Sequence, residues 1–347
     1  GRLRVMSKPW ELPWAELPHQ ALPLGEGRWR APATESEPCR RHLAGFGVLA
    51  LEDLEDGSGS YLIHDLQEFL PVLEEGHPED PAYRALWIAT RLHSARQAMA
   101  EPTQAPQFMA ILNLTPDSFS DGGQFQQGTM GALYHAQCLL AEDADILDLG
   151  AESTRPGAKD VAPEEQLQRL LPILEAVLPL GKPVSIDTRS AQVAAHCLEA
   201  GAHMINDVSG LSDPQMATLL AKHGCPAVLM HMRGTPADMQ ENCSYRHLRG
   251  EVADGLMDIA QKALDAGMDP QRVILDPGIG FAKTAEQSRA LIAGFGSFRA
   301  LGFPLLAGPS RKSFLADLLP HRTPAQRDGG SLGAAALCAA QGASYLR

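Results

Sequence analysis

The sequence lacks the features of a disulfide-stabilised, membrane-spanning or secreted chain. Its six cysteines are scattered along 347 residues and form no C-x-x-C pair, a pattern typical of reduced thiols in a reducing compartment. No run of 18 apolar residues occurs, so the sequence predicts no membrane-spanning helix. The first residues, GRLRV, lack the apolar stretch of a signal peptide, and we therefore expect a cytoplasmic protein.

Positive charge is also in short supply. The chain has 29 Lys and Arg against 42 Asp and Glu, a formal net charge of −13. Because binding to nucleic acid or to an acidic membrane needs a basic face, this balance argues against both partners. Small anions remain candidate ligands, since backbone N–H groups and a few cations act locally. The length allows one large barrel with a small appendage, or two ordinary domains.

A break in composition separates an N-terminal part from the rest of the chain. Residues 101–107, EPTQAPQ, form a polar, proline-containing linker. The preceding part, residues 1–107 with the linker included, is rich in Trp and Pro. It contains strand-like runs at 47–51 and 60–64 and a predicted helix at 81–99. No catalytic pattern is present there, so we expect a small α+β extension of unknown function.

Beyond the linker, short apolar runs alternate with amphipathic stretches. Alternation of this kind predicts a parallel sheet with helices between its strands. Eight runs within residues 108–347 fit a (β/α)8 barrel better than an open doubly wound sheet. The predicted strands are residues 108–114, 144–150, 183–188, 203–208, 227–232, 273–277, 304–308 and 344–347.

Residues that start or stop helices mark three of the intervening helices. One is predicted to begin at Pro163, and a second to begin at Ser190 and to stop at Gly201. A third is predicted to have Asp213 as its N-cap and to stop at Gly224. The eighth strand reaches the last residue. The predicted fold is therefore an α/β (β/α)8 TIM barrel, truncated at strand 8 and without its last helix.

Polar side chains stand at the carboxyl end of nearly every predicted strand, where the loops of such a barrel converge. Each has a structural alternative, because Asp and Asn after a strand are routine turn formers or helix N-caps. For Asp148 and Asp207 that alternative weighs as much as function. It is weaker for Asp187 and Asp276, which follow apolar strand residues and precede Thr or Pro-Gly. The set consists of Asn113, Asp148, Asp187, Asn206, Asp207, His231, Asp276 and the segment Ser310-Arg311-Lys312.

These side-chain types suit a heterocyclic ligand with an anionic group. Carboxylates and amides at the bottom of a pocket can read the donor–acceptor edge of a nitrogen heterocycle. Cations and backbone N–H groups at the rim suit a phosphate or a carboxylate. Gly278, Gly280 and Gly308 allow a flat ring or a backbone to approach closely.

Six segments resemble the signatures of dihydropteroate synthases, in the order of that family. They are FMAILNLTPDSFSDGG (108–123), ILDLGAESTRPGA (146–158), SIDTR with GAHMINDVSG (185–210), VLMHMRGTPADMQ (228–240), VILDPGIGFAK (273–283) and LLAGPSRKSF (305–314). The resemblance covers residues 108–347, which we expect to be a pterin-binding barrel. It implies attack of 4-aminobenzoate on (7,8-dihydropterin-6-yl)methyl diphosphate, with loss of pyrophosphate, in folate biosynthesis. It also implies inhibition by sulfonamides.

The resemblance implies a role for each matching residue. The pterin would bind Asp187, Asn206, Asp276 and Lys312. The 4-aminobenzoate would bind Thr154, Arg155, Pro156, Phe119, Phe281 and Ser310. The diphosphate would bind Asn113, His231 and Arg347. Catalysis would rest on Arg155, Asp187 and Lys312.

Mg²⁺ is the implied cofactor, held with the diphosphate by Asn113. An amide oxygen alone binds Mg²⁺ weakly, so we expect the ion to arrive with the substrate and to keep several waters. We expect a loose, carbocation-like departure of the diphosphate, stabilised by Mg²⁺ and Arg155. The aniline nitrogen is nucleophilic without deprotonation, so no dedicated general base is needed.

The end of the sequence departs from the last signature of the family. It should read roughly Arg-Val-His-Asp-Val, and the sequence ends at Arg347, its first residue. The readings are a truncated chain or gene fragment, a partner that supplies the missing piece, or a dead paralogue, and we favour truncation. The expectation is weak or no activity for this chain alone. Members of the family are commonly homodimers through helices late in the barrel, so a homodimer is an expectation that the missing helix makes less secure.

Two alternatives of other kinds stay open. A methyltetrahydrofolate-dependent corrinoid methyltransferase shares the barrel and the pterin-reading Asp and Asn positions. Such an enzyme does not need the Thr-Arg-Pro-Gly or Ser-Arg-Lys segments found here. A non-catalytic paralogue or interaction subunit is the other alternative.

Overall fold

The computed structural model describes two compact units, residues Gly1–Glu101 and Pro102–Arg347. In the first it describes the backbone of four strands. In the second it describes residues 105–114, 128–153, 160–246, 248–316, 318–319, 321–323 and 326–347. The helix predicted at 81–99 lies outside these residues.

The four strands of the first unit form an antiparallel sheet in the order β1-β2-β4-β3. Two of them, β3 (Val48–Asp53) and β4 (Ser58–Ile63), correspond to the strand-like runs expected from the sequence. The other two, β1 (Leu22–Gly25) and β2 (Arg28–Pro32), were not predicted. Both contain a proline, which is compatible with a strand only at an edge or an end, and β1 is an edge strand.

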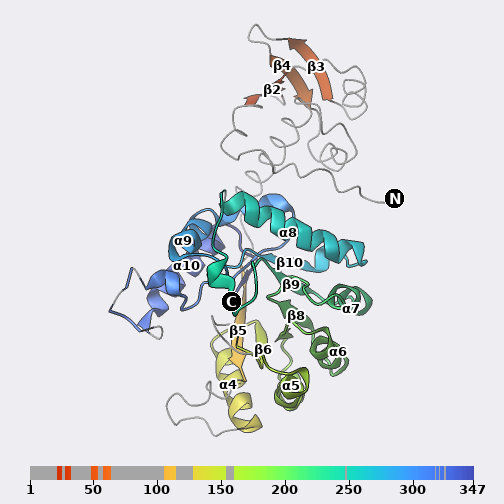
Figure 1. Cartoon of the computed structure of the whole chain (residues 1–347), viewed down its shortest axis with the longest axis vertical. Helices are drawn as coiled ribbons and strands as arrows, with labels where there is room; N and C mark the ends of the chain where they lie inside the picture. The colour runs from red at the N-terminus through yellow and green to blue at the C-terminus, as the bar shows by residue number, and fades with distance from the viewer. Residues whose placement is uncertain are drawn as a thin grey trace. The chain divides into compact units, whose positions relative to one another are not determined.

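The second unit contains a ring of eight parallel strands, which confirms the predicted barrel (Figure 1). Their order is β10-β9-β8-β7-β6-β5-β12-β11. A parallel bridge between Leu275 and Leu305 joins the two ends of this order. The eighth predicted strand is present and pairs with both neighbours. The strands are β5 (Gln107–Asn113), β6 (Ile146–Gly150), β7 (Val184–Asp187), β8 (Met204–Asp207), β9 (Ala227–Met230), β10 (Val273–Asp276), β11 (Leu306–Ala307) and β12 (Tyr345–Leu346).

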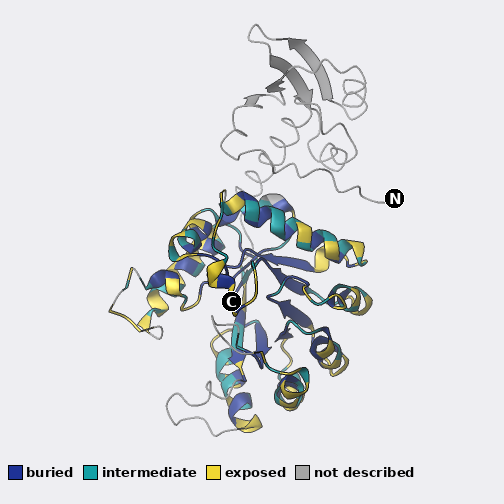
Figure 2. Ribbon diagram, in the orientation of Figure 1, coloured by how far each residue is buried: buried dark blue, intermediate teal, exposed yellow. Residues whose placement is uncertain are grey.

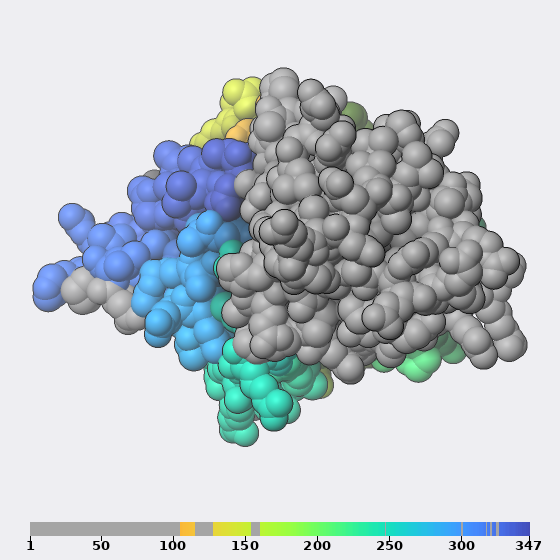
Figure 3. Space-filling model, turned by 90° about the horizontal axis from the view of Figure 1, so that it is seen from above, coloured from red at the N-terminus to blue at the C-terminus, as the bar shows by residue number. Residues whose placement is uncertain are grey.

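Helices alternate with these strands and lie outside them (Figure 1). They are α4 (Thr129–Ala141), α5 (Pro163–Val177), α6 (Ala191–Glu199), α7 (Met216–His223), α8 (Leu248–Asp265), α9 (Ala285–Ala293) and α10 (Asp328–Ala340). On the surface, the teal, light-blue and dark-blue atoms of α8, α9 and α10 follow one another around the barrel (Figure 3). No described helix has both the length and the apolarity that crossing a membrane requires.

The predicted helix ends are right in two of three cases. The helix at Pro163 begins as expected, and the Ser190 hydroxyl accepts a hydrogen bond from the Val193 N–H at 3.3 Å. The third prediction is wrong at its start. Gln215, not Asp213, directly precedes α7. The Asp213 carboxylate caps the turn before the helix, where it accepts hydrogen bonds from the N–H groups of Gln215 (2.9 Å) and, across the loop, of Ala191 (2.8 Å). The helix stops at Gly224 as predicted, with φ +64°.

Side chains alternate along each strand between the helices and the barrel interior. Those that face the helices form the main apolar core, and the strands from β6 to β11 are buried along their whole length (Figure 2). Those that face inward form two layers. The lower layer is apolar: Met109, Ile146, Met204, Val228, Ile274 and Leu306. Two residues farther along five of the strands, the inward positions include Asp148, Asn206 and Asp276. The barrel therefore has an apolar floor beneath a polar mouth.

Candidate active site

The polar mouth is built from strand ends in register. Asn113 pairs with Gly150, Gly150 with Asp187, and Asp187 with Asn206. A Cβ at Gly150 would lie 3.6 Å from the Cβ of Asp187 and 3.7 Å from Oδ1 of Asn113. Glycine therefore leaves a methyl-sized space open between these two side chains.

Arg347 joins the acidic residues of this mouth. Its Nε lies 2.6 Å from Oδ2 of Asp148, and its Nη2 lies 2.5 Å from Oδ2 of Asp187. The Asn206 amide donates to the same Asp148 oxygen at 3.1 Å. The structure thus brings together three predicted ligands, Asp187, Asn206 and Arg347, although Arg347 was expected with the diphosphate and not with the pterin.

Asp148 is the residue whose role the sequence left undecided. It is fully buried, and its Oδ1 is one of the few buried side-chain atoms in the described part of the chain without a hydrogen-bond partner. A buried carboxylate oxygen without a partner is costly, because it has lost its water. The structure therefore favours a functional role for Asp148, at the inward position that pairs with Ser185 of β7.

The pKa of Asp187 is raised to about 7, chiefly by burial and also by the nearby Asp148, Asp207 and Glu152, against the opposing effect of Arg347. Asp187 is 7% exposed. Its carboxyl group can therefore occur in either protonation state near neutral pH, either accepting from a heterocycle N–H or donating to a ring nitrogen.

Asp276 and Lys312 lie near each other in the mouth. Oδ1 of Asp276 accepts from the Gly278 N–H at 2.8 Å, and burial raises the pKa of this carboxyl although Lys312 lowers it. The Lys312 ammonium donates to the carbonyl of Ile279 and lies 4.4 Å from the centroid of the Phe281 ring, a cation–π contact. Burial lowers the pKa of Lys312 to about 8. A cation, a carboxyl group and an aromatic face are thus available together.

The residues predicted for 4-aminobenzoate are only partly described. Phe281 is 9% exposed beneath Lys312, and Ser310 is exposed at the end of β11. The other four lie outside the described residues: Thr154, Arg155, Pro156 and Phe119.

His231 is not joined to the other predicted diphosphate ligands. Its Nδ1 lies 3.1 Å from Nζ of Lys283, and a Cβ at Gly255 would lie 2.5 Å from its Cδ2 and 3.0 Å from its Nε2, so this edge packs on α8. Burial and Lys283 lower the pKa of His231 to about 2. A neutral imidazole packed on a helix favours a structural role, and contact with a diphosphate stays a prediction.

Asp207 has a structural role as a turn former, one of the two alternatives that the sequence left open. Its Oδ1 accepts from the N–H and the hydroxyl of Ser209, and its Oδ2 accepts from the Leu211 N–H at 2.8 Å. Both oxygens are therefore satisfied by the turn that follows β8.

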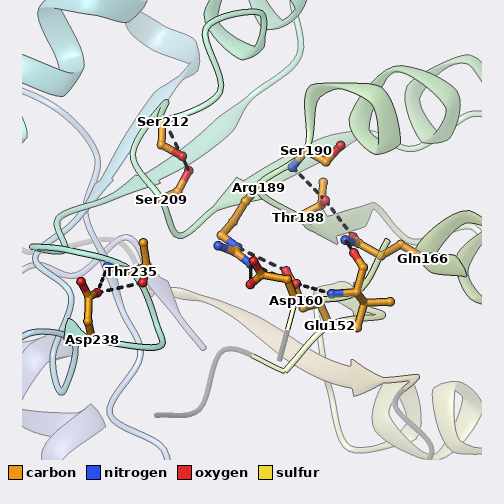
Figure 4. A network of polar contacts seen from close by, with 11 residues as sticks. Glu152, Asp160, Gln166, Thr188, Arg189, Ser190, Ser209, Ser212, Thr235 and Asp238 are labelled. Atoms are coloured by element: carbon orange, nitrogen blue, oxygen red, sulfur yellow. Dashed lines mark hydrogen bonds and ion pairs between the residues drawn. The ribbon is translucent and has the colours of Figure 1, made fainter. Parts of the chain in front are cut away.

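A polar network at the mouth was not expected from the sequence. Glu152, 8% exposed, accepts from the Val161 N–H at 3.0 Å and forms an ion pair with Arg189 at 2.9 Å. Arg189 also pairs with Asp160 at 3.0 Å, as the sticks of Figure 4 show. These contacts connect the chain on both sides of residues 154–159. No local pattern predicts them, because the partners are up to 37 residues apart.

The described residues include no group of three or more His, Cys, Asp or Glu side chains that could hold a metal ion. Asn113, the predicted Mg²⁺ ligand, is exposed at the end of β5 and offers one amide oxygen. This donor set fits a Mg²⁺ ion only if the substrate supplies most of its ligands.

Comparison with known proteins agrees with this geometry. Residues 109–347 match the family described as pterin binding enzyme. Dihydropteroate synthase from Synechocystis is 44% identical over 241 residues, 69% of this chain and 83% of that protein. The one from Escherichia coli is 40% identical over 243 residues, 70% and 86%.

Solved structures agree as well. The dihydropteroate synthase of Xanthomonas albilineans with 4-aminobenzoic acid is 40% identical, with a TM-score of 0.66 over 70% of this chain and 87% of that one. The Yersinia pestis enzyme in complex with a sulfonamide drug is also 40% identical, with a TM-score of 0.67 over 70% and 88%.

Proposed function

Since this chain belongs to the family of pterin-binding enzymes, we propose that its barrel mouth carries out the dihydropteroate synthase reaction with the residues described above. The function is that of a transferase of folate biosynthesis. The substrates are a dihydropterin methyl diphosphate and 4-aminobenzoate. The observation that carries the assignment of residues is the convergence of Asp187, Asn206, Asp276 and Lys312 on one mouth.

The pterin is the substrate that the polar side chains of the mouth would recognise. The carboxyl groups of Asp187 and Asp276 would face the N–H groups of its aminopyrimidinone edge, and the Asn206 amide would add a donor and an acceptor. The unpartnered Oδ1 of Asp148 offers a further acceptor at the same depth. Lys312 would donate to the ring oxygen or nitrogen, since a pKa lowered to about 8 still leaves its ammonium largely charged at neutral pH.

The diphosphate would leave toward the rim. Arg347 can turn from Asp187 to the anion, and Asn113 would hold the diphosphate together with Mg²⁺. When bound, the ion would neutralise the charge that develops on the departing group. Arg155 would add a second cation. Residues 154–159 follow Glu152, whose contacts with Val161 and Arg189 support both sides of that segment.

The bond changes follow from these positions. The methylene C–O bond breaks and its electron pair leaves with the diphosphate. The nitrogen lone pair of 4-aminobenzoate forms the new C–N bond, and the proton that this nitrogen loses passes to the released diphosphate or to water. Phe281 and Ser310 would hold the benzoate ring. Cytoplasmic location and dimerisation stay predictions.

Release of pyrophosphate tests this proposal. Purified protein is mixed with the dihydropterin methyl diphosphate, Mg²⁺ and 4-aminobenzoate, and pyrophosphate and dihydropteroate are measured together. We expect both products in equal amounts, and neither without 4-aminobenzoate, even if turnover is slow. Asp276→Asn should reduce kcat/KM by about tenfold or more, because a bond to a charged group contributes about 1.5–3 kcal/mol. Methyl transfer from methyltetrahydrofolate to a corrinoid without pyrophosphate release would overturn it.

A further inference from the structure

We infer that Lys283 is a positioning residue: its ammonium joins the chain after β9 to the turn after β10 and so holds Phe281 in the wall of the second-substrate pocket. This inference rests on the proposed function, because it assigns Phe281 to the pocket for 4-aminobenzoate. Lys283 lies within one of the segments that resemble the family, but neither the sequence patterns nor the reaction itself required a role for it.

The ammonium of Lys283 is buried and fully used. The residue is 3% exposed. Its Nζ lies 2.9 Å from the carbonyl oxygen of Phe281, 3.1 Å from Nδ1 of His231 and 3.4 Å from the carbonyl oxygen of His231. An ammonium has three N–H donors, and three acceptors from two segments surround it.

This arrangement is costly, which argues that it serves a purpose. A lysine is rarely buried unless it is paired with a carboxylate, and Lys283 forms no ion pair with any residue that the structure describes. Burial lowers the pKa of Lys283 to about 7, although Asp276 raises it. A methionine, which is unbranched and only one atom shorter, would fill most of the site at lower electrostatic cost, so packing alone does not explain a lysine here.

The turn that Lys283 holds is tight and strained. Its first part packs closely against the backbone of His231. A Cβ at Gly278 would lie 2.1 Å from the His231 carbonyl oxygen and 3.3 Å from Nζ of Lys283. Its last part contains Ala282, which has φ +50°, a conformation that costs a non-glycine residue about 1 kcal/mol or more. Strained backbone persists only where its surroundings fix it.

Two hydrogen bonds fix this strained part of the turn. Lys283 donates to the carbonyl of Phe281, and the Tyr245 hydroxyl donates to the carbonyl of Ala282 at 3.0 Å. The ring of Phe281 then lies under the ammonium of Lys312. Loss of the Lys283 contact frees the Phe281 backbone, whereas Lys312 keeps its own bond to Ile279. The effect should therefore fall on the second substrate more than on the pterin.

Replacement of Lys283 tests this division. In Lys283→Met we expect KM for 4-aminobenzoate and Ki for a sulfonamide to rise together, by about tenfold. The Kd for the pterin diphosphate alone, measured by calorimetry, should change less than about threefold. Lys262→Met, an exposed lysine of α8, is the matched control and should change neither. Lys283→Gln replaces the methionine variant if that variant does not fold.

A double-mutant cycle with Phe281→Leu separates positioning from a general loss of structure. If Lys283 acts through Phe281, the two substitutions together should raise KM for 4-aminobenzoate little more than Phe281→Leu alone. Additive effects, or equal losses of affinity for both substrates, would overturn the inference. Failure of the proposed function itself is seen separately, as absence of 4-aminobenzoate-dependent pyrophosphate release by the wild-type protein.

Discussion

Substitution of Asp187 by Asn should make the protein more stable at high pH while it abolishes activity. Asn has the same shape as Asp but does not ionise. Burial is the main reason for the raised pKa of Asp187, from 3.8 to about 7. A rise of this size corresponds to about 4 kcal/mol of preference for the protonated form in the folded state.

The sign of the pH dependence follows from the direction of this rise. The folded pKa lies above the unfolded one, so the folded protein binds the proton more tightly. The stability that this proton contributes is fully present below pH 4 and is lost as pH rises through about 7. Wild-type protein should thus lose up to about 4 kcal/mol of unfolding free energy across this window from Asp187 alone. The Asn variant should not.

Urea unfolding at several values between pH 4 and pH 8.5 measures the effect. The quantity to follow is the unfolding free energy of Asp187→Asn minus that of wild type. Groups that do not interact with Asp187 titrate alike in both proteins and cancel in this difference. Asp143→Asn is the control, because Asp143 is exposed and has φ 63°, which Asn tolerates. A difference that stays flat with pH, or that falls, would refute the reasoning.

Three further substitutions test other parts of the site. Gly278→Ala should lower the unfolding free energy by about 2 kcal/mol or more, because φ is +69° and the new Cβ would meet the carbonyl oxygen of His231; a loss under about 0.5 kcal/mol in urea unfolding contradicts this. Arg189→Gln should cost about 1–3 kcal/mol in thermal unfolding, since it leaves the buried Glu152 carboxylate without its cation; an unchanged Tm argues against the network. Asn113→Ala should raise the Mg²⁺ concentration for half-maximal activity several-fold, with little change in rate at saturating Mg²⁺; an unaltered Mg²⁺ titration removes Asn113 from the metal site.

The barrel could be predicted because local signals and fold agree. Each predicted strand from 108 onward is found, displaced by no more than a few residues, since a buried parallel strand reads as a short apolar run. The start of α7 was predicted two residues too early, since Asp213 caps the turn before the helix and also bonds with Ala191 across the loop, a contact that no local pattern contains. In the first unit, β1 and β2 were missed because their prolines resemble those of a loop.

The site could be predicted only as far as strand ends define it. The sequence correctly predicted that Asp187, Asn206 and Asp276 lie in one mouth, because a barrel brings the carboxyl ends of its strands together. The pairing of Arg347 with Asp148 joins residues 199 apart in the chain. Glu152 with Arg189, and Lys283 with His231, likewise depend on loops folding back. Such contacts are set by tertiary packing, and a single sequence carries no local trace of them.

The weak pairing of β11 and β12, where the ring of strands closes, determines how the barrel begins to unfold. β5 and β6 share five residue pairs, whereas β12 shares only two with each of its neighbours, β5 and β11, and a single bridge joins β11 to β10. A closed ring of strands should begin to come apart where it has the fewest hydrogen bonds, so amide hydrogens of β11 and β12 should exchange with solvent before those of β6 to β9. Arg347 directly follows β12. Opening of the ring at β11 and β12 would therefore also remove the cation that pairs with Asp148 and Asp187, so that loss of strand pairing and loss of these ion pairs occur together.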